Sequence, residues 1–469
     1  MSELEPKLTP ANENPWYVLM TLYGEQEGER VDVELHEKNR KAWNAWVGRG
    51  MSVEERAAAS KSSILEAREL GVPTSSQKFE MLERVADRHK AEMTRRNNDQ
   101  FEYPGLPELK HGIDLSATAF DHIVSCSKFV FPAEVDFNLS AFRSDTIFFI
   151  ATFREAVNCS EATFFSGADF GTVRFDGQAD FFATIFTKGA EFRSASFRKN
   201  TNFDKALFKS DVDFGFTTFD ADADFEMASF SAGVEFNSAT FSGFVYFVDA
   251  KFGVAGANGR CHPLFRECQF EKPTSFRSAM FLDTYPDFSG ATLHDKTTFR
   301  AKAQYWPKHP KQSAEEARES CAVIRHNVGN QGLPEDEHFF FRREMLFAGR
   351  YGPWPQRLTY QAFGWVSHYG ASIARPVRAL VTTVIAPAGM FAAALEKSGE
   401  GLNLADCFSG LALSFSNTFR LFGFQSLHFT GFYKDSDQIL DAVAGAQTIL
   451  GLVFLFFLGL GLRQRFRLR

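Results

Sequence analysis

The sequence predicts a mainly β protein, a central solenoid flanked by an α-rich N-terminal cap and a C-terminal α-helical membrane region. Between about Leu115 and Phe252, large apolar residues, nearly all phenylalanine, recur at intervals that alternate between five and six residues. A small apolar or β-branched residue stands two positions before each of them, and the remaining residues are polar or glycine. The middle of the series is Phe170, Phe175, Phe181, Phe186, Phe192, Phe197, Phe203, Phe208, Phe214, Phe219, Phe225, Phe230, Phe236, Phe241, Phe247 and Phe252.

This spacing fits neither an α-helix of period 3.6 nor a β-strand of strict period 2. It is an eleven-residue repeat, and a fixed period indicates structural units that bury little alone and must stack on their neighbours. Inward positions two residues apart match the alternation of side chains along a strand. Only a small residue leaves room beside stacked rings.

Units such as Ala168-Asp169-Phe170 and Ala239-Thr240-Phe241 resemble the pentapeptide-repeat family, in its eleven-residue variant. The resemblance implies a right-handed quadrilateral β-helix over residues 106–300, with each phenylalanine and the small residue before it pointing inward. Two five-residue and two six-residue steps then make a coil of twenty-two residues. Phe170, Phe192, Phe214 and Phe236 would form one column, each about 4.8 Å from the next.

The longer steps contain one additional residue, which falls just before the small residue. These additional residues are Gln178, Gly189, Asn200, Asp211, Asp222, Gly233 and Phe244. Gly, Asn and Asp dominate the set, so we expect bulges or turns with unusual backbone angles there. Because the longer steps alternate with shorter ones, we expect these residues on two opposite sides of the solenoid.

The same spacing extends backwards to Leu115 and, after a glycine-rich interruption from Gly253 to Leu264, forwards from Phe265 to Phe299. About thirty-three units, or eight coils, follow from this count. The predicted rod is roughly 40 Å long at one strand spacing per coil.

Residues 1–105 are predicted to form an α-rich cap domain. We expect no signal peptide, because Met1 to Asn14 is polar and acidic. Trp16 to Tyr23 is interpreted as a strand, and Val33 to Val47, Val53 to Leu70 and Ser76 to Asn97 as helices. The domain either hides the open end of the solenoid or binds a partner, and we favour the first interpretation.

The cysteines indicate neither disulfides nor a metal site. Cys126 and Cys159 occupy inward positions of the repeat, which suits packing. Cys261, His262 and Cys268 match no common zinc spacing. Burial of each phenylalanine is worth roughly 1.5–3 kcal/mol, so the core needs no metal. No phosphate loop, nucleophile elbow or histidine-rich helix occurs, and we expect neither a cofactor nor enzymatic activity.

One stretch is strongly acidic and contains Asp211, Asp213, Asp220, Asp222, Asp224 and Glu226. The family resemblance implies one possible role, because some pentapeptide-repeat proteins imitate the charge of duplex DNA and bind type II topoisomerases. The alternative is a solvated face that keeps the rod soluble. We favour the alternative, because lysines and arginines interrupt the acids elsewhere. The net charge of −7 argues against binding to nucleic acid itself.

Residues 313–373 are predicted to form a helical hairpin followed by an interfacial helix. Ser313 to Asn327 and Asp336 to Arg350 are the two expected helices of the hairpin. Gln356 to Ile373 is rich in aromatic residues and suits a membrane interface. Basic residues gather in this region, namely Arg342, Arg343, Arg350, Arg357, Arg375 and Arg378.

Residues 374–469 contain two predicted transmembrane helices, Ala379 to Leu395 with Pro387 inside it and Ala442 to Leu462. Arginines before the first and after the second place both ends of the region, and therefore the rod, in the cytoplasm. The sequence thus predicts a multi-pass protein of the bacterial inner (plasma) membrane.

Leu404 to Phe432, between the spans, is predicted to be a re-entrant segment. The layout resembles the two-helix pore module of potassium channels, whose filter would correspond to Asn417 through Phe424. Only one glycine remains and Arg420 would repel cations, so potassium selectivity does not carry over. The candidate pore residues are Asn417, Thr418, Arg420, Gly423 and His428.

Three functions are compatible with this organisation. The favoured one is a membrane-anchored scaffold whose cytoplasmic rod binds an unknown protein partner or further copies of itself. The second is an oligomeric, degenerate pore-loop ion channel gated by the rod, and the third is a DNA-mimicking topoisomerase binder. The expected partners are therefore the lipid bilayer, a protein, and other copies of the chain through the membrane region.

Overall fold

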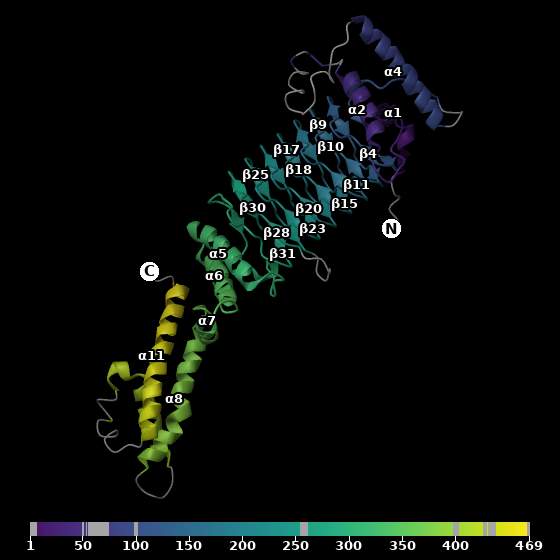
Figure 1. Cartoon of the computed structure of the whole chain (residues 1–469). Helices are drawn as coiled ribbons and strands as arrows, with labels where there is room; N and C mark the ends of the chain where they lie inside the picture. The colour runs from purple at the N-terminus through teal and green to yellow at the C-terminus, as the bar shows by residue number, and fades with distance from the viewer. Residues whose placement is uncertain are drawn as a thin grey trace. The chain divides into compact units, whose positions relative to one another are not determined.

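A computed structural model of the whole chain shows a parallel β-solenoid with helices at either end of the sequence (Figure 1). The structure describes residues 7–48, 51, 52, 54, 75–97, 102–253, 261–396, 403–424, 429 and 438–466. Contacts between residues divide the chain into two compact units, Met1–Phe340 and Phe341–Arg469. The expected helix from Val53 to Leu70 lies outside the described residues, apart from Glu54.

The solenoid consists of short parallel strands in four sheets, which the chain visits in turn. We name each sheet by its first solenoid strand. The β2 sheet contains β2 (Ile113–Asp114), β6 (Val135–Asp136), β10 (Val157–Asn158), β14 (Ala179–Asp180), β18 (Thr201–Asn202), β22 (Ala223–Asp224), β26 (Val245–Tyr246), β30 (Thr274–Phe276) and β32 (Thr298–Phe299). The β4 sheet contains β4 (Val124–Ser125), β8 (Thr146–Ile147), β12 (Ala168–Asp169), β16 (Ala190–Glu191), β20 (Val212–Asp213), β24 (Val234–Glu235) and β28 (Pro263–Leu264).

The other two sheets alternate with these around each coil, so the β2 and β4 sheets are opposite one another. The β3 sheet contains β1 (Thr9–Pro10), β3 (Thr118–Phe120), β7 (Ala141–Phe142), β11 (Thr163–Phe164), β15 (Ile185–Phe186), β19 (Leu207–Phe208), β23 (Ser229–Phe230), β27 (Lys251–Phe252) and β31 (Met280–Phe281). The β5 sheet contains β5 (Val130–Phe131), β9 (Thr152–Phe153), β13 (Arg174–Phe175), β17 (Ser196–Phe197), β21 (Thr218–Phe219), β25 (Thr240–Phe241) and β29 (Gln269–Phe270).

The predicted aromatic column is confirmed. The rings of Phe170, Phe192, Phe214 and Phe236 stack nearly parallel, with successive centroids 4.9 Å apart. All four side chains are fully buried. Strand pairing follows the predicted twenty-two-residue register, as in the pair Ala168 and Ala190. The expected interruption is also confirmed, because Val234 pairs with Pro263 and the stack resumes from Phe236 to Phe265 at 5.1 Å.

The additional residues of the longer steps lie before strands of the β2 and β4 sheets, on opposite sides as expected. The expectation of unusual backbone angles at them is wrong. Gly189 and Gly233 do not have positive φ, and their carbonyls accept hydrogen bonds from Ala168 N and Val212 N of the preceding coil, at 3.1 and 3.0 Å. These residues therefore add one more hydrogen bond between neighbouring coils, and they do so with negative φ, as in a regular strand.

Positive φ occurs instead two residues after every second inward residue, at φ between 46° and 62°. The positions are Ala117, Lys128, Leu139, Ile150, Glu161, Thr172, Ala183, Ser194, Lys205, Phe216, Met227, Ser238, Asp249, Glu267 and Ser278. The left-handed conformation costs a non-glycine residue roughly 1–2 kcal/mol. Inter-coil hydrogen bonds hold it in place, for example Lys205 N to Glu226 O at 2.8 Å.

The N-terminal segment contains a helix where the sequence predicted a strand. Residues Trp16 to Tyr23 largely belong to α1 (Pro15–Met20), which follows the 3-10 turn η1 (Ala11–Glu13). Pro15 takes the first helical position, and the Asn14 side chain accepts from Trp16 N and Tyr17 N. A capped proline start outweighs the β propensity of the aromatic run. All later residues of α1 are buried, which removes the helical periodicity from the sequence.

The N-terminal residues cover the first coil of the solenoid. Strand β1 pairs in parallel with β3 and extends that sheet. Helix α2 (Val33–Val47) covers the adjacent β5 strand edge: Asn44 Oδ1 accepts from Val130 N at 3.0 Å, and Trp43 Nε1 donates to Val130 O at 2.9 Å. These side chains replace a missing neighbouring strand, so α2 hides an edge that would otherwise pair with other chains. Helix α4 (Ser75–Arg96) and the 3-10 turn η2 (Leu109–His111) complete this region.

The last coil is covered in a similar way. After η3 (Ala303–Tyr305), the Trp306 ring stacks on Phe281 at 4.9 Å. Helix α5 (Ala314–Asn330) begins with the capping box of Ser313 and Glu316, and its end donates from Gln331 Nε2 to Thr297 O at 2.6 Å. Helices α5 and α6 (Pro334–Ala348) lie close to the bounds that were predicted for the two helices of the hairpin.

The second unit contains α7 (Trp354–Ser367), α8 (Ala374–Leu395), α9 (Leu404–Thr418), the 3-10 turn η4 (Arg420–Phe422) and α11 (Gln438–Phe466). Helices α8 and α11 are long and apolar enough to cross a membrane. Gly410 and Gly451 allow close packing of α9, because a Cβ would lie 2.5 Å from Ala388 O at the first and 2.1 Å from Thr418 O at the second. Helices α8, α9 and α11 therefore form one bundle.

Candidate functional site

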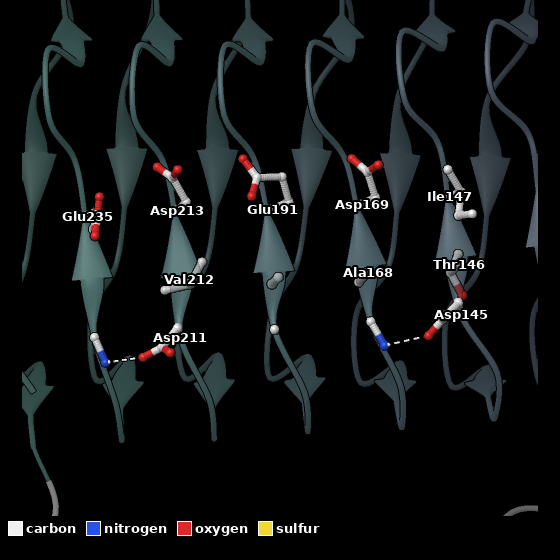
Figure 2. Close-up of a pocket in the computed structure, with 14 residues that line it drawn as sticks. Asp145, Thr146, Ile147, Ala168, Asp169, Glu191, Asp211, Val212, Asp213 and Glu235 are labelled. Carbon is white, nitrogen blue, oxygen red and sulfur yellow. Dashed lines mark hydrogen bonds between the residues drawn. The ribbon is translucent and has the colours of Figure 1, made fainter. Parts of the chain in front are cut away.

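Two clusters of polar side chains stand out, one on the solenoid and one inside the helical bundle. The first follows the outer surface of the β4 sheet, where Asp169, Glu191, Asp213 and Glu235 occupy equivalent positions in four successive coils (Figure 2). With Asp145 and Asp211 they line a groove of about 760 Å³. We call these six residues the acidic groove.

Several acids of the solenoid have a structural task that explains their position. Asp169 Oδ1 accepts a hydrogen bond from Gly171 N at 2.8 Å, and Asp224 Oδ1 on the opposite sheet accepts from Glu226 N at 2.8 Å. Each contact fixes the backbone just before a residue with positive φ. Short carboxylate and amide side chains commonly hold turns in this way. The Asp of an Ala-Asp-Phe unit is therefore a turn-stabilising residue.

A second set of acids connects neighbouring coils. Asp211 Oδ1 accepts from Gly233 N at 2.7 Å, and Asp222 Oδ1 accepts from Phe244 N at 2.9 Å. Donor and acceptor are twenty-two residues apart, which is one coil. Figure 2 shows the first of these contacts and the equivalent one from Gly167 N to Asp145 Oδ1, at 3.0 Å. These carboxylates thus extend the inter-coil hydrogen bonding beyond the backbone.

In the acidic groove, burial and neighbouring carboxylates disfavour the ionised form of two of the acids. Burial raises the pKa of Asp169. Burial, and then the negative charges of Asp213 and Asp169, raise the pKa of Glu191. Asp213 is the better compensated member, because Arg193 Nη1 lies 3.1 Å from its Oδ2. The groove therefore favours protons, cations or basic groups over water alone.

The six acids predicted as one interaction face do not lie together. Asp211 and Asp213 are on the β4 sheet, whereas Asp222 and Asp224 are on the opposite β2 sheet. Asp220 lies exposed between them, after β21, and Glu226 follows β22. A run of sixteen residues spans most of one coil, so acids that are adjacent in sequence point in different directions. The acids that share a face are twenty-two residues apart.

The second cluster lies at the centre of the helical bundle and is organised by Pro387. Proline has no N–H, so the carbonyl of Thr383, four residues earlier in α8, has no helical donor. The Gln447 side chain of α11 supplies one, with Nε2 2.8 Å from Thr383 O. The same nitrogen lies 2.7 Å from Ser414 Oγ of α9, which in turn donates to Val384 O at 2.5 Å. Gln447 and Ser414 are buried.

Two of the predicted pore residues belong to this cluster. Asn417 Nδ2 donates to Gln447 Oε1 at 3.4 Å, and Thr418 Oγ1 donates to Ser414 O at 2.9 Å. Both side chains are buried between helices of the same chain. Arg420 is exposed in η4, and Gly423 ends that turn with φ 76°. His428 lies outside the described residues.

Sequence reasoning missed Ser414 and Gln447. Their signal was a proline within one apolar span and an amide within the other, which together indicate a hydrogen bond across helices. The predicted packing role of Cys126 and Cys159 agrees with their burial. Cys261 and Cys268 are also buried, and Cys268 Sγ contacts Phe236 O at 2.8 Å. Burial raises the pKa of Cys268 to about 12, and no group of metal-binding side chains occurs among the described residues.

No protein-family model, no curated protein and no solved structure matches this chain. The fold is that of a parallel β-solenoid followed by two apolar C-terminal helices.

Proposed function

We propose that this protein is a membrane-anchored scaffold of the pentapeptide-repeat type, with the solenoid in the cytoplasm as its interaction surface. One observation carries the proposal: α8 and α11 expose large apolar side chains along their length. Ile385 is 61% exposed, Ile449 65% and Phe456 63%. Apolar surface of this extent is unusual on a soluble monomer, whereas it suits the hydrocarbon core of a bilayer.

Helix α7 supports the same proposal. Trp354, Leu358 and Trp365 are exposed and lie within about 40° of one another around the helix axis, at 3.6 residues per turn. The other side packs onto α11, where the rings of Phe363 and Phe457 stack at 5.5 Å. An amphipathic helix with outward tryptophans is typical of the membrane interface.

The repeat pattern supports the solenoid as a binding surface. Outward side chains of the coils face solvent and can contact a partner, because the inward phenylalanines form the core. The acidic groove concentrates carboxylates on one face of the solenoid and would suit a basic protein segment. Anchorage of such a rod beneath the membrane would hold its partner there.

The test is retention of the full-length chain in the membrane. Phe456→Arg places a charge on an exposed position of α11, at a cost of about 2.5–3.5 kcal/mol near the centre of a spanning helix. We expect alkaline extraction of membranes to release this variant more readily than the wild type. The matched control is Phe216→Arg, at an exposed phenylalanine of the solenoid, which should leave retention unchanged. Recovery of the wild-type chain in the soluble fraction without detergent would refute the proposal.

A second candidate is an oligomeric pore-loop channel, and one observation favours it. Helix α9 has fifteen residues, about 22 Å at 1.5 Å per residue, so it is too short to cross a bilayer core of about 30 Å. It packs between the two long helices, as a re-entrant helix would. Ion flux through liposomes that is lost on Gly423→Leu would support this candidate, and liposomes that remain impermeable would support the scaffold.

The topoisomerase-binding candidate is the weakest of the three. DNA mimicry requires regularly spaced acids that face solvent, but Asp211, Asp222 and Asp224 hold backbone amides. The acids also divide between opposite sheets. We expect the full-length chain not to inhibit a type II topoisomerase, and inhibition would restore this candidate.

A further inference from the structure

The helical unit contains an apolar groove between α8 and α11 that none of the functions above uses. Its volume is about 900 Å³, within the range of about 300–1,000 Å³ that small-molecule sites occupy. The walls are small or apolar side chains, among them Ala386, Met390, Ala446 and Leu450. The gap exists because the wall residues Ala386 and Ala446 have short side chains, and because Gln447 turns its amide towards Thr383 O.

One end of the groove is cationic. Arg375 and Arg378 line it there, beside the exposed indole of Trp365. Arg375 Nη1 donates to Gly364 O of α7 at 2.9 Å, which fixes this guanidinium at the groove mouth. Among the described residues of the unit, no carboxylate forms an ion pair with Arg375 or Arg378, and none lines the groove. Burial, and then the positive charges of Arg342 and Arg375, lower the pKa of His368, which lies between α7 and α8.

The dimensions agree with one leaflet of a bilayer. Arg378 and Met390 are twelve residues apart on α8, about 18 Å along the helix axis. Half of a hydrocarbon core of about 30 Å is about 15 Å. A ligand with its anionic group at the arginines would therefore place an acyl chain along the apolar walls.

We propose that this groove is a binding site for one anionic phospholipid, with its phosphate at Arg375 and Arg378 and one acyl chain between α8 and α11. The proposal rests on the proposed membrane anchorage. Charge complementarity favours a lipid over a helix from a second copy, because the apolar surface of a helix offers nothing to two arginines. Arginine pairs readily with phosphate oxygens, and an indole at the groove mouth suits the headgroup region.

The test is native mass spectrometry of the full-length chain in detergent, with phosphatidylglycerol and phosphatidylcholine of identical acyl chains in competition. We expect the wild type to retain one phosphatidylglycerol in preference to phosphatidylcholine. Arg378→Gln should lower that preference about fivefold, the effect of one arginine near a charged headgroup. Ala386→Phe should fill the groove and abolish retention of both lipids. Ile385→Phe, on the adjacent exposed residue outside the groove, is the matched control and should bind as the wild type does.

Other results would overturn the proposal in distinguishable ways. Equal retention of the two lipids, or equal binding by Ala386→Phe and Ile385→Phe, would exclude the site. Displacement of the lipid by soluble glycerol phosphate at equal concentration would show a phosphate site without an acyl-chain site. Dissociation of an oligomer by Ala386→Phe alone, without any lipid retained, would show that a second copy fills the groove. All these outcomes leave membrane anchorage intact, which alkaline extraction reports separately.

Discussion

Gln447 is predicted to compensate for Pro387, and a double-mutant cycle can measure that compensation. The change Gln447→Leu keeps the size of the side chain but removes the donor at 2.8 Å from Thr383 O and the contact with Ser414 Oγ at 2.7 Å. A buried polar group without a partner costs about 1–3 kcal/mol, but hydrogen bonds between membrane helices average only about 0.6 kcal/mol. We therefore expect a loss of about 1–2 kcal/mol in the stability of α8.

The second arm of the cycle is Pro387→Ala, which restores an N–H that can reach Thr383 O within the helix. In that background Gln447→Leu leaves the carbonyl satisfied, so its cost should fall by about 0.6–1.7 kcal/mol. The coupling is the quantity of interest, because neither single change isolates it.

Hydrogen exchange of α8 peptides from the full-length chain in detergent is the suitable assay, since it reports local opening. We expect exchange to accelerate roughly five- to thirtyfold in Gln447→Leu, from the loss of about 1–2 kcal/mol. The acceleration should be clearly smaller in the double variant. The control is Ile449→Leu, at an exposed position of α11, the helix that carries Gln447. In this variant the α8 peptides should exchange at the wild-type rate. An equal effect of Gln447→Leu with and without the proline would refute the argument that this amide serves the proline.

Three further predictions concern the solenoid and are read from denaturant unfolding of the full-length chain. Phe214→Ala should lower the free energy of unfolding by about 3–5 kcal/mol, because it removes a buried ring. Phe216→Ala, at a half-exposed ring, should lower it by at most about 1 kcal/mol, through the lost contact with Arg193. Equal losses would contradict the stacked core. Asn44→Ala should cost about 2–3 kcal/mol, because it leaves a strand-edge amide and a carbonyl without partners, and an unchanged midpoint would exclude the capping role. Glu191 has a raised pKa in the fold, so its contribution to the free energy of unfolding is full at acid pH and declines as pH rises through that pKa. Glu191→Gln should therefore stabilise the solenoid at neutral pH and not at acid pH. A loss of stability in this variant at neutral pH would contradict the sign.

The inside of the solenoid could be predicted because it repeats. Alternation along a strand fixes which residues point inward, and the spacing of Phe192 and Phe214 fixes the length of one coil, so column, register and interruption all followed. The turns could not be predicted in the same way. Composition indicated Gly189 and Gly233 as the unusual positions, but the unusual φ belongs to residues such as Lys205. Hydrogen bonds with the next coil impose the conformation of Lys205. The residue types at these positions therefore do not reveal the positive φ.

The candidate sites were less predictable, because they depend on which residues share a face. The acidic run from Asp211 to Glu226 appeared to be one surface in the sequence, and the structure divides it between opposite sheets. The acidic groove combines residues from successive coils, so its acids are separated by twenty-two residues and interspersed with bases. A listing of the sequence in rows of that length would have placed Asp169, Glu191 and Asp213 in one column.

Three of the residues that sequence reasoning missed share one physical role. Asn44 completes the backbone of the first β5 strand, Gln331 donates to the last coil, and Gln447 donates to the carbonyl that Pro387 leaves without a partner. Each is a carboxamide that meets a main-chain group at an irregularity, where the regular ladder or helix ends or is broken. The partners are 34 to 86 residues away in the chain, and a backbone group has no residue type that could mark it. Such contacts follow from the rule that buried main-chain groups need partners, but only after the fold shows which groups lack them. A regular repeat therefore specifies its own interior, whereas the residues that complete its ends and repair its breaks are recognisable only in three dimensions.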